Sequence, residues 1–261
     1  MTKVISFLNR KGGTGKTTSA LYVATALRRM GFQEVTLMET DRNYSLATLK
    51  AMRQDNDDLE SYPEIIQTRD ADIVRIIGQL CQAMKDVVVV DGAANMSAAS
   101  LRAIARSSNV IALPCSLSPA EILVTRMTVE DISEDALQAG AGMVLLPVRI
   151  HWFTQQRTIE AALSGIGVQL LPLYVPNFKQ YTDLQRLTPG ECYEMVTREL
   201  LRVMSRPVHQ VQPVDSGTAV QVMKHYKTCV QCGEGFWAKS AKAEYCSTAC
   251  RVAHHRQLVR V

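Results

Sequence analysis

A glycine- and lysine-rich stretch near the start of the chain, "FLNRKGGTGKTT" at residues 7–18, carries the clearest chemistry in the sequence. It follows a strand-like run and precedes a helix-like one, the context that separates a phosphate-binding loop from a chance match. Gly12, Gly13 and Gly15 allow the backbone to turn successive N–H groups inward, around phosphate oxygens and above a helix N-terminus. The stretch therefore predicts a nucleotide site.

The side chains of this loop have separate expected tasks. Lys16 is expected to reach the β- and γ-phosphates, and Thr17 to offer its hydroxyl to Mg²⁺. Thr18 is expected to bond the α-phosphate, and Thr14 completes the set of nucleotide-binding residues. Lys11 is a second lysine at the mouth of the loop, where the usual pattern has no fixed demand for one. Because Lys16 already occupies the phosphate side, Lys11 is better placed to meet a nucleotide bound by a second subunit.

The elements that must position this loop are visible as short apolar runs. Six of them alternate with helical patterns: "KVISFL", "EVTLME", "DVVVVD", "NVIALP", "GMVLLPV" and "VQLLPLYV". Continuous rather than alternating apolar runs indicate strands buried on both faces, as in a parallel sheet covered by helices. We therefore expect a doubly wound α/β domain over residues 1–204, with a mostly parallel sheet and "GECYEMVTRELLRVM" as its last helix.

The segment "KGGTGKTT" resembles the deviant Walker A box of the ParA/MinD family of P-loop ATPases. The longer run "KVISFLNRKGGTGKTTSALYVATALRRMG" is most similar to the small ParF-like plasmid-partition proteins. In that family the signature lysine crosses a dimer interface to the partner's ATP, which implies this role for Lys11. The resemblance covers roughly residues 1–204 and implies ATP and Mg²⁺ as ligands, with weak intrinsic ATP hydrolysis.

Two further segments resemble boxes of the same family. "VTLMETDRNYS" matches the D-x-D-P-Q box, which implies that Asp41 orients the attacking water and senses the γ-phosphate. Glu39 stands there for the first aspartate, and Arg42 and Asn43 replace proline and glutamine. "DVVVVDGAA" resembles a Walker B strand, which implies that Asp91 holds a Mg²⁺-bound water.

Two later segments resemble the base-contacting parts of ParF-like proteins. "LLPVRIHW" points to Arg149, and "LYVPNFKQY" points to Pro176 and Asn177. An exposed arginine and an ordinary turn are the alternatives for these three residues.

Four cysteines near the C-terminus have metal-ligand spacing. Cys229 and Cys232 form C-x2-C, and Cys246 and Cys250 form C-x3-C after thirteen intervening residues. Four thiolates in this arrangement predict one tetrahedral, structural Zn²⁺. Because so small a segment cannot bury much apolar surface, the metal would supply the fold of residues 227–261. Four unrelated reduced cysteines are the alternative.

Residues 205–226 mix proline, glycine, serine and glutamine without an apolar period, which predicts a linker. From residue 205 onward there are eight Lys/Arg and three Asp/Glu, whereas the preceding residues are nearly neutral. The basic C-terminal part could contact nucleic-acid phosphates. A solvated helix face is the alternative, and His254 or His255 could replace a cysteine as a zinc ligand.

The composition is that of a soluble globular protein, with 47% hydrophobic and 21% charged residues in a chain of 261. No apolar run approaches the roughly 18 residues that a membrane span requires. We therefore expect a cytoplasmic protein, and we expect Cys81, Cys115 and Cys192 to be buried free thiols.

The leading functional hypothesis is an ATP-switched DNA-partition protein. It would form an ATP-dependent homodimer or a higher polymer, bind DNA without sequence preference in the nucleoid, and be stimulated by a ParB-like centromere-binding partner. Three alternatives stay open: a MinD-like membrane-cycling or cargo-positioning ATPase, a nucleotide-sensing zinc-finger transcription regulator, and an electron donor that would use Cys115 as a cluster ligand.

Overall fold

The computed structural model describes residues 1–41, 46, 62–178, 181, 190–205, 225–228, 230–231, 235–238, 244–245 and 250. The chain divides into two compact units, Met1–Val220 and Gln221–Val261. Arg42 and Asn43, Cys229, Cys232 and Cys246, and both His254 and His255 lie outside the described residues.

The first unit is built on a seven-stranded sheet in which every neighbouring pair is parallel. Across the sheet the strands are β3 (Glu64–Gln67), β2 (Val35–Glu39), β4 (Val87–Asp91), β1 (Lys3–Phe7), β5 (Val110–Cys115), β6 (Gly142–Pro147) and β7 (Gln169–Leu170). Every residue of β2, β4 and β5 is buried. The continuous apolar runs therefore form buried parallel strands, and the expected α/β fold is confirmed.

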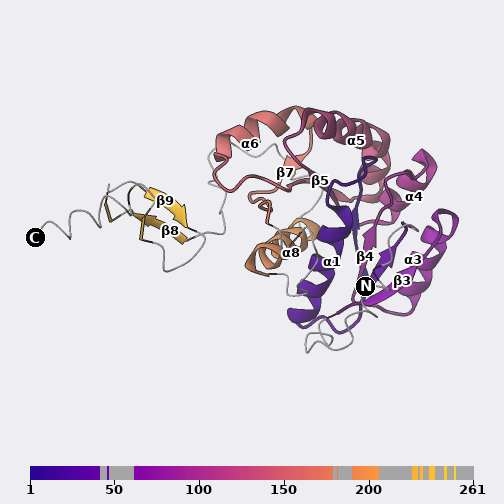
Figure 1. Cartoon of the computed structure of the whole chain (residues 1–261). Coiled ribbons are helices and arrows are strands. Elements are labelled where there is room, and N and C mark those ends of the chain that lie inside the picture. Colours follow the sequence, from indigo (N-terminus) through magenta and orange to yellow (C-terminus); the bar gives the residue numbers. More distant parts are fainter. Residues whose placement is uncertain are drawn as a thin grey trace, which may run out of the picture. The chain divides into compact units, whose positions relative to one another are not determined.

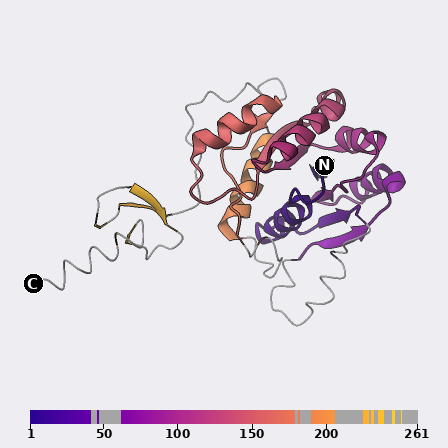
Figure 2. The ribbon, with the colours of Figure 1, turned by 45° about the horizontal axis from the view of Figure 1, so that its top comes forward.

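Helices cover both faces of this sheet (Figure 1). They are α1 (Lys16–Arg29), α3 (Ile73–Gln82), α4 (Ala98–Ser107), α5 (Pro119–Ala139), α6 (Gln156–Leu163) and α8 (Gly190–Met204), with the 3₁₀ turns η2 (Asp70–Asp72) and η3 (Ser164–Ile166). Helices α1 and α8 pack together on one face, while α3, α4 and α5 lie side by side on the other (Figure 2). Helix α8 has the bounds that the sequence predicts.

The carboxyl ends of three strands lie level with one another. Phe7 at the end of β1 pairs with Asp91 at the end of β4, and Asp91 pairs in turn with Glu39 at the end of β2. The chain passes from β1 through α1 to β2 on one side of β1, and from β4 through α4 to β5 on the other side, so the strand order reverses at β1. Ligands of open α/β sheets bind at such a point, beyond the carboxyl ends of the strands.

The structure corrects three details of the sequence analysis. Strand β3 was not expected, because its four residues lie at a sheet edge and are partly exposed. The run "VQLLPLYV" forms only the two-residue β7, since Pro172 has no N–H to donate to a strand ladder. Cys81 is exposed rather than buried, whereas Cys115 and Cys192 are buried as expected.

The second unit contains an antiparallel hairpin of β8 (His225–Thr228) and β9 (Gly235–Ala238). Strand β8 begins at His225, slightly before residue 227, where the composition places the start of the C-terminal module. Cys250 is half-buried.

Candidate nucleotide-binding site

A cavity of about 270 Å³ opens where the loop after β1 meets the carboxyl edge of the sheet. Residues 12–18 of the loop and the start of α1 line the cavity, and so does Asp41. The rest of the lining includes residues 148–149 and 175–178, together with the aromatic residues Tyr181 and Tyr193. The structure therefore brings Asp41, Arg149, Pro176 and Asn177 together with the predicted phosphate loop, although they are far apart in the sequence.

The loop has the backbone geometry that the glycines predict. Gly13 and Gly15 have φ angles of 72° and 89°, a region that other residues rarely adopt. Helix α1 begins at Lys16, and Ser19 donates its backbone N–H to the Gly15 carbonyl at 2.9 Å. The loop thus ends on a helix N-terminus whose first three residues, 16–18, line the cavity, an arrangement suited to anions.

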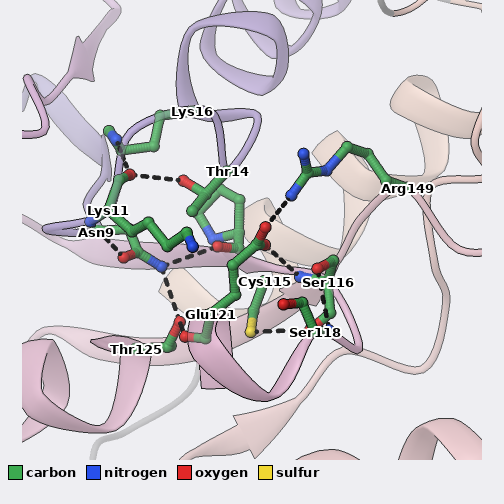
Figure 3. A network of polar contacts seen from close by, with 11 residues as sticks. Asn9, Lys11, Thr14, Lys16, Cys115, Ser116, Ser118, Glu121, Thr125 and Arg149 are labelled. Atoms are coloured by element: carbon green, nitrogen blue, oxygen red, sulfur yellow. Dashed lines mark hydrogen bonds and ion pairs between the residues drawn. The ribbon is translucent and has the colours of Figure 1, made fainter. Parts of the chain in front are cut away.

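Lys16 is the buried cation of this site. Its side chain is buried, and its Nζ donates to the Lys11 carbonyl oxygen at 2.9 Å (Figure 3). Burial lowers the pKa of Lys16, and the negative charges of Asp91 and Asp41 partly offset that effect. Incoming phosphate oxygens would add the negative charge that a buried ammonium lacks.

Asp91 is a buried carboxylate that fits a magnesium site. It is 1% exposed, and no hydrogen bond of ordinary geometry reaches its carboxylate oxygens from the described residues, although the Thr17 hydroxyl lies close by. Burial raises the pKa of Asp91 to about 7, although the neighbouring Thr17 hydroxyl and the Lys16 charge lower it in part. Oxygen ligands and waters are what Mg²⁺ prefers. Thr17 and Asp91 together would hold Mg²⁺, directly or through a bound water.

Lys11 is held through its backbone alone. Its N–H donates to Asn9 Oδ1 at 3.0 Å, and its carbonyl accepts from Lys16 and from the Thr14 hydroxyl, the latter at 3.4 Å (Figure 3). The Lys11 ammonium makes no hydrogen bond or ion pair with any part of the chain that the structure describes. Lys11 does not line the cavity. Its backbone shapes the loop while its charge stays available.

Two residues of the expected acidic box, Glu39 and Thr40, make hydrogen bonds to the backbone that the sequence does not predict. Thr40 Oγ1 donates to the Asp91 carbonyl at 2.8 Å and accepts from the Ala93 N–H at 2.6 Å. The Glu39 carboxylate is buried, accepts from the Leu46 N–H at 2.9 Å, and has a pKa that burial raises. Thr40 therefore ties the end of β2 to the segment after β4, and Glu39 anchors the chain beyond Asp41.

An aromatic cluster forms one wall of the cavity and was also missed. Phe178, Tyr181 and Tyr193 line the cavity. Tyr193 stacks on Tyr22 with ring centroids 5.0 Å apart, and its hydroxyl lies 3.1 Å from Ser19 Oγ in helix α1. Aromatic faces of this kind suit a nucleobase. No spacing rule connects Phe178 and Tyr181 with Tyr193, because Tyr193 lies in helix α8, beyond their segment of the chain.

Gly92 is a point of close approach beneath the cavity. Its N–H donates to the Phe7 carbonyl at 3.1 Å, and an added Cβ would lie 2.7 Å from Leu8 Cδ2 and 2.9 Å from the Phe7 oxygen. Because backbone must shift to make room, Gly92→Ala should lower the free energy of unfolding by about 1–3 kcal/mol. Chemical denaturation of the ligand-free chain measures this.

Gly78 provides the matched control for that substitution. It lies within α3, and a Cβ there would meet nothing within 4 Å. Gly78→Ala should raise the free energy of unfolding by about 0.4–1 kcal/mol, because alanine restricts the unfolded chain. Equal effects of the two substitutions would contradict the close approach at Gly92.

The cysteines divide between the described and undescribed parts of the chain. Cys115 is fully buried, its thiol donates to the Ser116 carbonyl at 3.2 Å, and burial raises its pKa to about 11. These features indicate that Cys115 is a structural thiol. Within the described ranges, no three His, Cys, Asp or Glu side chains group as a metal site. Because three of the four predicted zinc ligands fall outside those ranges, the zinc site stays a prediction.

Comparisons with known proteins give one family model and several solved structures of similar fold. Residues 2–128 match the family model of an AAA domain, whereas no curated protein matches the sequence. None of the helices in the described part of the chain is long and apolar enough to cross a membrane.

Solved structures share the fold at low sequence identity. The MinD cell division protein of Aquifex aeolicus is 16% identical with a TM-score of 0.58, covering 77% of this chain and 97% of its own. A plasmid partition protein from Borrelia burgdorferi is 15% identical with a TM-score of 0.56, and the match covers 77% of this chain and 98% of that protein. Cobyrinic acid a,c-diamide synthase of Mycobacterium smegmatis, with bound ADP and magnesium, is 17% identical with a TM-score of 0.61, covering 82% and 98%. The chain has the fold of these proteins.

Proposed function

We propose that this chain is an ATP-hydrolysing switch of the DNA-partition kind, which dimerises on ATP and Mg²⁺. The observation that carries the proposal is the Lys11 ammonium, which has no partner in the described chain although it adjoins a loop already supplied with Lys16. A cation in this position is suited to a nucleotide bound by a second copy. The monomer would then be a poor catalyst, and ATP would control assembly.

The residues in and around the cavity have distinct proposed roles. The loop N–H groups and Lys16 bind the phosphates, while Asp41 lines the cavity where it can orient an attacking water. Thr17 and Asp91 hold Mg²⁺, which supplies charge compensation on the phosphate oxygens when bound. Arg149, Pro176 and Asn177 contact the nucleoside. Lys11 of each copy compensates charge on the nucleotide of the other, which stabilises the transition state of phosphoryl transfer.

The structural likenesses support a nucleotide-driven role. The relatives include a protein described with bound ADP and magnesium and another described as a plasmid partition protein. A further likeness is a MinC:MinD complex from Aquifex aeolicus. These descriptions favour a switch that works with a partner. For this chain we propose a ParB-like partner that stimulates hydrolysis and releases the dimer from DNA.

We propose that the C-terminal unit provides an additional contact with DNA. Cys229, Cys232, Cys246 and Cys250 would hold one structural Zn²⁺, and the net basic charge from residue 205 onward would attract phosphate groups. DNA bound in this way would be recognised by charge and not by sequence, which suits a protein that moves over the nucleoid.

The test measures assembly and DNA binding of the full chain with MgATP and MgADP. Light scattering should give a dimer with MgATP and a monomer with MgADP, and only the dimer should bind duplexes of unrelated sequence with equal affinity. The double variant Cys229→Ser/Cys232→Ser should dimerise normally but bind DNA more weakly and contain less zinc. A chain that stays monomeric with MgATP, or that floats with liposomes in place of binding DNA, would contradict the partition role.

A further inference from the structure

Glu121 is a buried carboxylate in the first turn of helix α5. It is only 6% exposed; its Oε2 accepts from the Ser116 N–H at 3.1 Å, and its Oε1 pairs with the Arg149 guanidinium (Figure 3). Burial alone would raise the pKa of Glu121, but the hydrogen bonds from Arg149 and Ser116 outweigh burial and hold it below its usual range. Glu121 is therefore ionised, and its charge is paired with that of Arg149.

Helix α5 is fixed to the segment that enters the phosphate loop. Asn9 Nδ2 donates to Thr125 Oγ1 at 2.8 Å, and the Arg10 N–H donates to Thr128 Oγ1 at 3.2 Å. The Arg10 guanidinium also forms an ion pair with Asp131 at 3.0 Å. Because these contacts span two turns of α5, the position of Glu121 is set relative to the loop.

A continuous set of hydrogen bonds joins the two ends of the cavity through this helix (Figure 3). Lys16 donates to the Lys11 carbonyl, Lys11 donates to Asn9, and Asn9 donates to Thr125. The Thr125 hydroxyl donates to the Glu121 carbonyl at 2.7 Å. The side chain of Glu121 then leads to Arg149. The arginine is thus held by the same framework that shapes the loop.

The Arg149 backbone is constrained independently of its side chain. Its φ angle is 55°, a conformation uncommon for residues other than glycine. On either side of it, the Val148 N–H donates to the Cys115 carbonyl at 3.0 Å and the Ile150 N–H donates to the Val175 carbonyl at 3.1 Å. Since the backbone is fixed by its neighbours, the ion pair with Glu121 decides where the guanidinium lies along the cavity wall.

Pairing with a buried carboxylate changes what Arg149 can offer a ligand. The two charges cancel locally, so the guanidinium contributes directed N–H donors and a flat face more than net positive charge. The phosphate loop has its own cation in Lys16. Beside Arg149 the cavity is lined by Val175, Pro176 and Phe178. Such an apolar lining with a few fixed donors suits a nucleoside better than a phosphate.

We propose that Glu121 is a positioning residue for nucleoside recognition, which holds Arg149 as a fixed donor at the nucleoside end of the cavity. The inference rests on the proposed nucleotide site and adds the residue that makes binding depend on the base and ribose. A phosphate chain without a nucleoside should then bind independently of Glu121.

The experiment compares MgATP with magnesium tripolyphosphate by calorimetric titration of the full chain. Glu121→Gln should weaken ATP binding about tenfold, the effect of one lost charge-assisted hydrogen bond, and change tripolyphosphate binding less than twofold. Arg149→Lys should do the same, because an ammonium cannot reproduce the planar fork. The double variant should lose no more than either single one, since both act through one contact. Glu130→Gln, an exposed charge change on α5, should leave both affinities unaltered.

The outcomes separate this inference from the proposed function. A wild-type chain that binds neither ATP nor tripolyphosphate contradicts the nucleotide site itself. Equal weakening of ATP and tripolyphosphate by Glu121→Gln, or additive losses in the double variant, overturns the positioning role and leaves the nucleotide site intact. Should Glu121→Gln fail to fold, Arg149→Lys still decides, because its side chain is 42% exposed and a wild-type ratio of the two affinities would overturn the proposal.

Discussion

Replacement of Lys11 by alanine should abolish ATP-dependent dimerisation while leaving the monomer folded and able to bind ATP. The hydrogen bonds of Lys11 all use its backbone: the N–H to Asn9, and the carbonyl from Lys16 and Thr14. Alanine keeps each of them, so the loop should keep its shape. What is lost is the Lys11 ammonium, which has no partner in the described chain.

The size of the effect follows from the chemistry of phosphoryl transfer. A cation supplied across an interface to the transferring phosphoryl group is worth on the order of 10³-fold or more in rate. We therefore expect Lys11→Ala to reduce ATP turnover by about that factor, with ATP affinity of the monomer changed by less than about threefold. Light scattering with MgATP and a phosphate-release assay measure the two properties.

Lys3→Ala is the matched control for this experiment. Lys3 is an exposed lysine at the amino end of β1, so its removal changes the net charge equally but at the edge of the sheet away from the loop. Normal dimers and turnover are expected for Lys3→Ala. Normal dimers and turnover for Lys11→Ala as well would mean that Lys11 does not act across an interface.

The phosphate loop and the strands beside it were predictable because their signals are local. The loop has glycines where the backbone adopts positive φ, and β4 is an unbroken run of valines ending in Asp91. The residues expected to bind phosphate and Mg²⁺ therefore lie within a few residues of the sequence patterns that predict the loop and the strand. The cavity also includes Arg149, Pro176 and Asn177, which only a family resemblance pointed to.

The contacts that shape the site were not predictable because they join distant segments. Asn9 meets Thr125 across 116 residues of chain, and Thr40 meets Ala93 across 53. Which hydroxyl faces which amide depends on strand register and helix placement. A threonine within a strand end, or a glutamate in a helix's first turn, looks the same in the sequence whether or not it finds such a partner.

Asp91 should show opposite effects on stability with and without its ligand. Its carboxylate is buried, no hydrogen bond of ordinary geometry reaches it from the described residues although the Thr17 hydroxyl lies close by, and burial raises its pKa to about 7. An acid with a raised folded-state pKa costs stability as pH rises from its unfolded value toward 7, and the full cost is present above that. Because the shift already includes the attraction of Lys16, neutralising Asp91 should stabilise the ligand-free fold.

We therefore expect Asp91→Asn to raise the free energy of unfolding at pH 8 by roughly 1–4 kcal/mol without nucleotide. The gain should disappear as the pH falls toward 4, where the wild-type carboxyl is protonated. With saturating MgATP the order should reverse, since the wild type gains stability from the bound ligand and the variant loses the group that holds Mg²⁺. Thermal and chemical unfolding with and without MgATP, with Glu130→Gln as the surface control, measure both parts.

The reversal is the informative result, because the two halves have different causes. Relief of a buried charge explains only the gain in stability without nucleotide. Loss of a group that holds Mg²⁺ explains only the smaller gain in stability when MgATP binds. An asparagine variant that is less stable without nucleotide would show that the Asp91 carboxylate is satisfied by groups outside the described contacts. A variant stabilised by MgATP as much as the wild type would place Mg²⁺ elsewhere. Both changes together are what we expect of a buried carboxylate that helps to hold Mg²⁺.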